Sequence, residues 1–173
     1  ITQMISPEKD VDCMNPATLA GIFEPSEGLK TPCTPQAVIE MLRYYDIEMT
    51  GKKVAVLGRS SVIGKPVALL LLNENATVTI CHSKTADLRE TVREADIVIS
   101  AMGRAKMIDG SYIREGATLI DVGINTDEDG KLCGDADFES AEKVAGAISP
   151  VPGGVGSVTT TILAKNLLSG ISE

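Results

Sequence analysis

The chain has few aromatic residues: its 173 residues include no Trp, two Phe and three Tyr. A buried core must therefore be built from aliphatic side chains and Met, which are typical of parallel sheets flanked by helices. Long apolar runs are also lacking. The longest, such as residues 67–72, are far shorter than the roughly 18–20 residues that cross a bilayer, so we expect a soluble chain without a membrane partner.

Positive charge is in deficit as well, with 16 Lys and Arg against 24 Asp and Glu and a formal net charge of −8. Such a chain has no general basic field that would attract a nucleic acid, so we expect no nucleic-acid partner. It has one His and four Cys without a Cys-x-x-Cys motif, a composition that supports neither a metal site nor a disulfide framework. Reduced thiols are typical of a cytoplasmic protein.

The residues that are present suit one globular domain, since 43% are hydrophobic and 23% are charged. Residue 1 is Ile rather than an initiator Met, so we expect the chain to be part of a longer protein. Residues 1–33 contain four prolines and show no clear periodicity, which predicts a loop-rich lead-in. We place the main domain at residues 34–173.

From residue 34 onward, short β-branched runs alternate with amphipathic segments. The first helix should begin with Thr34 as its cap and Pro35 in its first turn. Helices are predicted over residues 35–46, 65–73, 85–94 and 157–168. Strands are predicted over residues 53–57, 77–81, 97–101, 118–122 and 146–149. The alternation predicts an α/β fold of Rossmann type, a doubly wound, mainly parallel sheet with helices on both faces.

One segment, residues 125–142, departs from this alternation because it contains seven acidic residues and one Lys. Its carboxylates match no metal-ligand spacing. We therefore interpret it as a solvated loop or hairpin rather than a metal site.

A glycine turn follows the first predicted strand, where a Rossmann fold binds a dinucleotide. The usual G-x-G-x-x-G is replaced by Gly58-x-Ser60-x-x-x-Gly64. Small residues let the backbone approach a pyrophosphate, and the helix that follows supplies free N–H groups and a partial positive charge. Nucleotide binding is the favoured interpretation, and a structural turn that binds nothing is the alternative.

The residues after the second predicted strand bear on the choice of cofactor. NAD-binding folds usually place an Asp or Glu about 20 residues beyond the glycine turn, whereas an NADP site offers cations and hydroxyls to the 2′-phosphate. Here the sequence is CHSKT at residues 81–85, without a carboxylate. Ser83 and Arg59 can approach the same phosphate, so NADP is favoured over NAD. His82 is either a partly exposed loop residue or a functional one.

Six segments carry a wider resemblance. They are ISPEKDVD at 5–12, TPCTP at 31–35, GRSSVIGKP at 58–66, CHSKT at 81–85, DVGIN at 121–125 and PVPGGVG at 150–156. In this order they resemble the bifunctional methylenetetrahydrofolate dehydrogenase/methenyltetrahydrofolate cyclohydrolase family. Together with the glycine turn, the resemblance implies an NADP site lined by Gly58, Arg59, Ser60, Gly64, Ser83 and Ile124. It also implies that a folate substrate is faced by Asp12, Pro152, Gly153, Gly154, Val155 and Gly156.

The activity implied by this resemblance is NADP-dependent oxidation of methylenetetrahydrofolate, followed by hydrolysis of the methenyl product to formyltetrahydrofolate. It belongs to one-carbon metabolism and purine biosynthesis, and the resemblance implies a homodimer. Family members also carry an N-terminal domain with a YxxxK motif, which is absent from this chain. We therefore assign no catalytic residue and expect an NADP-binding domain with one wall of the folate cleft, poorly active by itself. The alternatives are another Rossmann oxidoreductase, similar to shikimate dehydrogenase, and a non-catalytic NADP-binding module.

Three positions differ from the family's motifs: Cys13 and Ala37 stand where glycine is usual, and Ser157 replaces a proline. If position 13 needs a positive φ, a Cys there costs about 1 kcal/mol or more and can shift the neighbouring Asp12.

Overall fold

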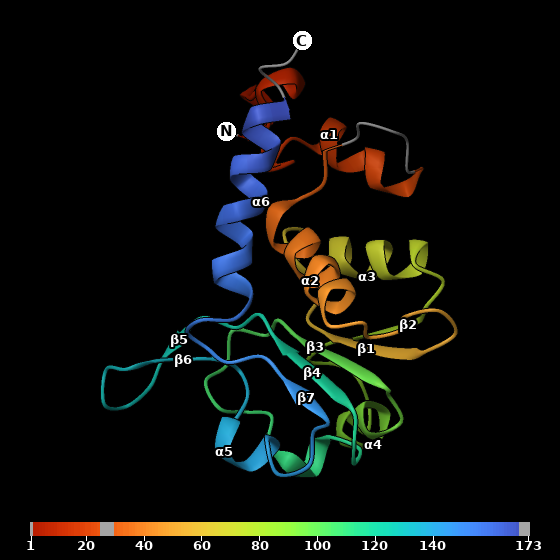
Figure 1. Ribbon diagram of the computed structural model, residues 1–173, viewed down its shortest axis with the longest axis vertical. Helices are drawn as coiled ribbons and strands as arrows, with labels where there is room; N and C mark the ends of the chain where they lie inside the picture. The colour runs from red at the N-terminus through yellow and green to blue at the C-terminus, as the bar shows by residue number, and fades with distance from the viewer. Residues whose placement is uncertain (1, 25–29, 170–173) are drawn as a thin grey trace.

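A computed structural model describes residues 2–24 and 30–169 (Figure 1). Residues 170–173, the end of the predicted main domain, lie outside the described residues, as do residues 1 and 25–29. The centre is a parallel sheet of five strands in the order β2-β1-β3-β4-β7. The strands are β1 (Lys53–Leu57), β2 (Thr77–Cys81), β3 (Ile97–Ser100), β4 (Thr118–Asp121) and β7 (Ala147–Ile148). The chain reverses its direction of winding at β1, and ligands of such sheets bind over the carboxyl ends of the strands at that point.

Helices cover both faces of the sheet, which confirms the predicted fold class (Figure 1). One face carries α2 (Cys33–Tyr44), α3 (Gly64–Asn73) and α6 (Val155–Ser169), and the other carries α4 (Leu88–Arg93), α5 (Phe138–Ala141) and the short helix η4 (Gly110–Tyr112). Along β1, Val54 and Val56 face the first set of helices, whereas Ala55 and Leu57 face the second. Successive side chains of a strand point to opposite faces of the sheet, and both faces are buried here. The strands are therefore apolar at consecutive positions rather than at alternate ones.

The lead-in contains short helical turns and packs onto the domain. It forms η1 (Thr2–Met4), η2 (Pro7–Lys9), α1 (Pro16–Ala20) and η3 (Gly21–Phe23). Ile22 of η3 is buried in the first core. Asn166 of α6 donates from Nδ2 to the carbonyl oxygens of Val11, at 2.9 Å, and Thr31, at 3.3 Å. The start of the described chain therefore lies beside the C-terminal half of α6 (Figure 1).

The N-terminus of α2 is capped differently from the prediction. The helix begins at Cys33, so Thr34 lies inside it and the prediction of Thr34 as the cap was wrong. The N–H of Cys33 instead donates to Oδ1 of Asp12 at 2.9 Å. A carboxylate supplied by the lead-in thus satisfies one of the free N–H groups of the helix, and no local sequence pattern indicates such a long-range cap.

The helix predicted over residues 85–94 is shorter than expected, because α4 spans only Leu88–Arg93. Asp87 has φ +46°, a left-handed conformation that a right-handed helix excludes. Residues 82–85 form a separate turn, which belongs to the site described below.

The acidic segment forms a hairpin only in part. β5 (Asn125–Thr126) and β6 (Leu132–Cys133) pair antiparallel and project from the domain at the left of Figure 1. The prediction of a solvated segment was wrong for its second half, where Asp135 has no exposed surface and Ala141 of α5 is buried. Charge counting cannot distinguish a solvated carboxylate from a buried one that is surrounded by N–H donors.

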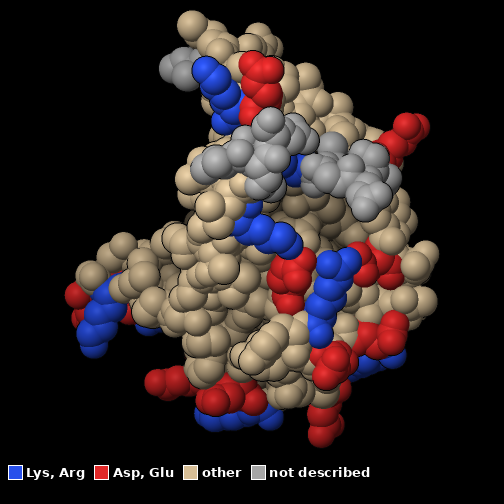
Figure 2. Space-filling view, turned by 45° about the horizontal axis from the view of Figure 1, so that its top comes forward, with Lys and Arg blue, Asp and Glu red and all other residues tan. Residues whose placement is uncertain are grey.

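Charged side chains form no dominant patch of one sign on the side drawn in Figure 2, where acidic and basic side chains are interspersed. Within residues 2–24 and 30–169, no helix is long and apolar enough to span a bilayer. In the same residues, no group of three or more Asp, Glu, His or Cys side chains gathers to hold a metal ion. Binding of an anion must therefore depend on local geometry.

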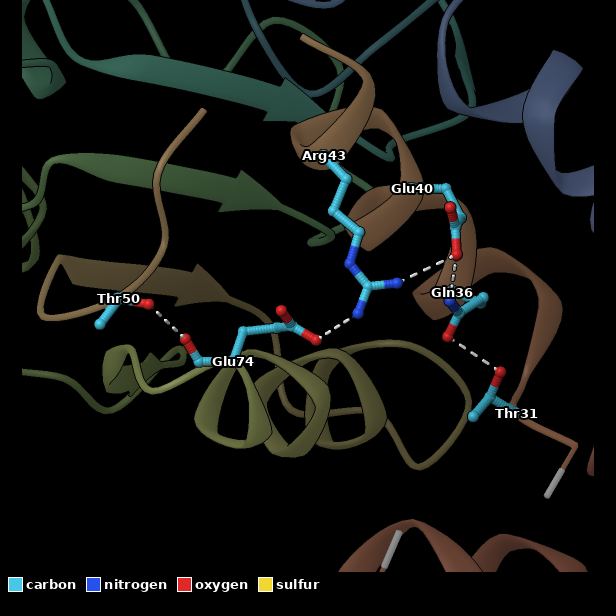
Figure 3. Close-up of polar contacts among 6 residues, drawn as sticks. All are labelled: Thr31, Gln36, Glu40, Arg43, Thr50 and Glu74. Carbon is cyan, nitrogen blue, oxygen red and sulfur yellow. Dashed lines mark hydrogen bonds and ion pairs between the residues drawn. The ribbon is translucent and has the colours of Figure 1, made fainter. Parts of the chain in front are cut away.

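A row of polar contacts joins α2 to the end of α3 (Figure 3). Gln36 accepts from Thr31 at 3.0 Å and donates to Glu40 at 2.7 Å. Arg43 then bridges Oε1 of Glu40, at 3.3 Å, and Oε1 of Glu74, at 2.6 Å. The row fastens the two helices on their outer side.

Replacing Arg43 by Ala should nevertheless have a small effect. The Arg43 side chain is 49% exposed, and ion pairs at the surface typically contribute about 0–1 kcal/mol. We expect the free energy of unfolding in urea to fall by less than about 1 kcal/mol, with a smaller loss at high salt. A loss above about 2 kcal/mol would show that the row contributes more than exposed pairs do.

Candidate functional site

The turn after β1 requires glycine at two positions. Gly58 has φ +122°, and a Cβ atom there would collide with the carbonyl oxygen of Ala101 at the end of β3. A Cβ atom on Gly64 would collide with the carbonyl oxygen of Gly58. Only glycine therefore allows β1, the start of α3 and the end of β3 to meet this closely.

Ser60 closes this turn over the N-terminus of α3. Its Oγ atom accepts from the N–H groups of Ile63, at 3.1 Å, and Gly64, at 3.4 Å. The first turn of α3 contains Lys65 and no acidic residue. Ser60 remains exposed, so its hydroxyl hydrogen can donate to a bound anion.

A second tight turn follows β2 and presents Ser83. The N–H of His82 donates to Oγ1 of Thr85 at 2.8 Å, and the N–H of Lys84 donates to Nδ1 of His82 at 3.1 Å. The His82 ring thus shapes the turn, which leaves Ser83 exposed at its tip. The N–H of Gly58 donates to the carbonyl of Cys81 at 2.9 Å, so the two turns are held side by side.

A cavity of about 310 Å³ lies over the carboxyl ends of β1, β2 and β3; we call it the basic cavity. It is lined by Gly58, Arg59, Ser60, Cys81, His82, Ser83, Leu88, Ala101, Met102, Arg104 and Met107. The structure therefore brings together Gly58, Arg59, Ser60 and Ser83 of the predicted cofactor residues, while Gly64 is buried at the start of α3. The lining contains two arginines and no carboxylate, which suits an anionic ligand.

The wall of this cavity that follows β3, including Met102, Arg104 and Met107, was not predicted from the sequence. A usable signal existed, since these residues come directly after a predicted strand. In a parallel sheet the carboxyl ends of neighbouring strands lie at the same edge, so the residues after β3 must adjoin those after β1.

A second cavity of about 360 Å³ lies over the ends of β4 and β7, between α2 and the start of α6; we call it the glycine-loop cavity. It is lined by Thr34, Asp121, Val122, Gly123, Ile124, Leu132, Pro150, Val151, Pro152, Gly153, Gly154, Val155, Gly156, Ser157 and Thr159. All five predicted residues of the loop 152–156 are present. Ile124, which is 72% exposed, lies beside this loop rather than among the residues around Arg59.

The loop enters α6 through two glycines. Gly153 has φ +99°, and a Cβ atom on Gly154 would collide with the carbonyl oxygen of Pro150. Ser157, one of the departures, donates its N–H to the carbonyl of Gly154 at 3.1 Å, a bond that proline cannot form. The substitution is therefore compatible with the loop. Ala37, another departure, is fully buried within α2, where alanine suits a helix better than glycine.

Asp12 lies apart from the loop 152–156. It lines a neighbouring cavity of about 220 Å³ together with Cys13, and Thr34 borders both this cavity and the glycine-loop cavity. Cys13, which stands where the family usually has glycine, has a positive φ of +51°. The backbone strain expected for a Cys at this position is therefore present. Burial raises the pKa of the Cys13 thiol to about 12, which keeps it neutral.

A buried carboxylate, which the sequence analysis also missed, supports the basic cavity. Oδ2 of Asp135 accepts from Ser100 Oγ at 3.1 Å, Met102 N at 2.6 Å and Gly103 N at 3.3 Å. Oδ1 accepts from Arg104 N at 2.8 Å and Asn125 Nδ2 at 2.9 Å. Asp135 thereby fixes the backbone after β3 and ties it to the hairpin beside Ile124.

Asp121, which lines the glycine-loop cavity, likewise accepts hydrogen bonds from several backbone N–H groups. Its carboxyl group accepts from the N–H groups of Gly123 at 2.9 Å, Asp135 at 3.1 Å and Ala136 at 2.7 Å. Burial raises the pKa of Asp121, although these hydrogen bonds oppose the shift. Cβ atoms on Gly123 and Gly134 would collide with the Asp135 and Asp121 side chains, so glycine is needed beside each carboxyl group.

The parallel sheet, the glycine turn and the cation-lined cavity beside it define a nucleotide-binding α/β domain. Comparison with known families gives the particular family. The model described as "Tetrahydrofolate dehydrogenase/cyclohydrolase, NAD(P)-binding domain" matches residues 32–173, and the chain belongs to this family. The predicted resemblance is confirmed, and the alternative of a shikimate dehydrogenase-like enzyme is excluded.

Individual relatives agree with this assignment. "Bifunctional protein FolD" of Clostridioides difficile is 55% identical over 168 residues, which cover 97% of this chain and 58% of that protein. The crystal structure of the bifunctional enzyme FolD from Campylobacter jejuni superposes with a TM-score of 0.95 at 40% identity, covering 99% of this chain and 61% of that one. FolD from Trypanosoma brucei, complexed with NADP cofactor and inhibitor, gives 0.92 at 44% identity, with coverages of 99% and 61%. The chain spans about three fifths of these relatives.

Proposed function

We propose that this chain is the NADP-binding domain, with one wall of the folate cleft, of a bifunctional enzyme. The enzyme oxidises methylenetetrahydrofolate to methenyltetrahydrofolate and hydrolyses that product to formyltetrahydrofolate. The observation that carries this proposal is the basic cavity, which Arg59 and Ser83 line from neighbouring turns and which no carboxylate lines. Membership of the family supplies the reaction.

The shape of the site supports a dinucleotide cofactor, because the glycine turn brings β1, the start of α3 and the end of β3 into close contact beside the basic cavity. Gly58 admits a pyrophosphate to the backbone, and Ser60 and the N-terminus of α3 can donate to it. Arg59 and Ser83 would hold the 2′-phosphate that distinguishes NADP from NAD. The absence of a carboxylate from the cavity lining favours NADP, since an NAD site usually offers one to the ribose hydroxyls.

The glycine-loop cavity would hold the reacting end of the ligands. Exposed Ile124 offers an apolar surface to a flat ring, and Gly153 and Gly154 let a second flat ring lie against the backbone. When bound, NADP supplies the hydride acceptor. This chain's contribution is to position the two rings and limit access of water, and such positioning can supply several kcal/mol of rate enhancement.

Hydrolysis of the methenyl product needs acid–base assistance, and the sequence contains no YxxxK motif to give it. We propose that a further N-terminal domain supplies this group across the cleft. Residues 1–33 form the lead-in and part of that cleft, and residues 34–173 form the NADP-binding domain. The cavity beside Asp12 adjoins the glycine-loop cavity at Thr34, which is consistent with one continuous cleft. The family resemblance also leads us to propose a cytoplasmic homodimer that serves one-carbon metabolism and purine biosynthesis.

The chain by itself should bind NADP and yet be a poor enzyme. We expect calorimetry to show NADP binding, and oxidation of methylenetetrahydrofolate, followed by NADPH absorbance, to be at least about 100-fold slower than in a full-length relative. The full-length relative serves as the control for the assay. Turnover by the chain at an ordinary enzyme rate would contradict the need for a further domain.

A non-catalytic NADP-binding module is the second candidate, because the acid–base motif is absent. The two functions differ in their response to folate. If the chain forms part of a folate cleft, methylenetetrahydrofolate should change its affinity for NADP, since the two ligands would share the glycine-loop cavity. An affinity for NADP that is independent of folate would favour the module.

A further inference from the structure

The basic cavity contains a second guanidinium, that of Arg104, which has no role in the proposed function. In the strand order β2-β1-β3, the turn with Arg59 lies between the turn with Ser83 and the segment with Arg104. The segment with Arg104 therefore flanks the turn with Arg59 on the side opposite the turn with Ser83. None of the ion pairs found in the described part of the chain uses Arg59 or Arg104. Both charges are available to a ligand.

The backbone that carries Arg104 is held from below. Its N–H donates to Oδ1 of fully buried Asp135 at 2.8 Å, and the N–H groups of Met102 and Gly103 donate to Oδ2. The side chain lies along Met107, with Nη1 3.8 Å from its sulfur atom. Arg104 thus extends from a fixed backbone position, which lowers the entropic cost of binding through its guanidinium.

The charge of the ligand's 2′-phosphate is larger than Arg59 alone can neutralise. A phosphate monoester carries about −1.5 to −2 charges at pH 7, and one guanidinium neutralises only one of them. No carboxylate lines the cavity to cancel a second cation. We propose that Arg104 is a second residue for the 2′-phosphate and, with Arg59, sets the preference for NADP over NAD. This proposal rests on the proposed function.

The test compares the dissociation constants of NADP and NAD for the chain and its Arg104→Gln variant by calorimetry. Loss of one charge-assisted hydrogen bond should weaken NADP binding about tenfold, with NAD binding unchanged within about twofold. Arg104→Lys keeps the charge and should bind NADP within about threefold of the original chain. Arg93→Gln, an exposed position of α4 outside the cavity, removes the same charge and should change neither constant beyond about twofold.

The possible results separate the proposals. Equal weakening of NADP and NAD by Arg104→Gln would place the guanidinium on the part common to both cofactors and overturn this inference. Unchanged NADP binding by Arg104→Gln, with a large loss in Arg59→Gln, would also overturn it and leave the proposed function intact. Failure of the original chain to bind NADP would overturn both proposals. Equal thermal midpoints of the variants and the original chain would show that the affinities report binding rather than folding.

Discussion

Replacing Asp135 by Asn is expected to lower the free energy of unfolding by about 3 kcal/mol or more. The two carboxylate oxygens of Asp135 accept from five donors: three N–H groups of the segment after β3, the Ser100 hydroxyl at the end of β3, and the Asn125 amide. An Asn side chain puts an NH₂ group where one of these oxygens stands, and buried N–H groups then face each other without an acceptor. Urea denaturation measures the change.

Asp129→Asn is the matched control, because it makes the same substitution at an exposed position of the same acidic segment. It should change the free energy of unfolding by no more than about 0.5 kcal/mol. If the two variants were equally stable, the buried network would have no special energetic role. Affinity for NADP should fall in Asp135→Asn even under conditions where the variant is folded, because the backbone around Arg104 loses its support.

Replacing Gly58 by Ala should abolish measurable NADP binding and destabilise the fold by about 3 kcal/mol. The added methyl group would collide with the carbonyl oxygen of Ala101, so either the turn or the end of β3 must move. Such movement would displace the backbone that is expected to receive the pyrophosphate. Calorimetric titration with NADP and thermal unfolding measure the two effects.

Gly51→Ala is the control that distinguishes the effect of the collision at Gly58 from the effect of a positive φ alone. Gly51 also has a positive φ, +73°, but a Cβ atom there meets no neighbouring atom. Its replacement should cost only the roughly 1 kcal/mol of a left-handed alanine and leave NADP binding unchanged. Loss of NADP binding in Gly51→Ala would show that general destabilisation, and not the collision at Gly58, removes the site.

Local sequence patterns predicted the parallel sheet and the basic cavity in part. Apolar strands that alternate with helices form a parallel sheet, in which all strands end at the same edge. Ser83 and Arg59 each follow a strand, so the pattern alone predicts that they lie near each other. The glycine spacing was informative for the same reason, because close backbone contacts at Gly58 and Gly64 exclude other residues. These features depend on short stretches of chain and on general rules of strand connection.

The remaining features depend on contacts between distant segments. Asp12 caps α2 from the lead-in, and Asp135 reaches back from the hairpin to the end of β3. In sequence, both residues resemble ordinary loop carboxylates, and only the fold supplies their N–H donors. The left-handed Asp87, which delays the start of α4, is likewise compatible with the local pattern but not specified by it.

The contact of Asn166 with Val11 has a consequence for how further polypeptide can be attached. It brings the beginning and the end of the described chain to one corner of the molecule, next to the lead-in that carries Asp12 (Figure 1). Segments joined at either end would therefore leave from the same place, as in domains that tolerate insertion into another protein or circular permutation. We therefore expect the sheet and both cavities to keep their geometry when further polypeptide is joined at this corner.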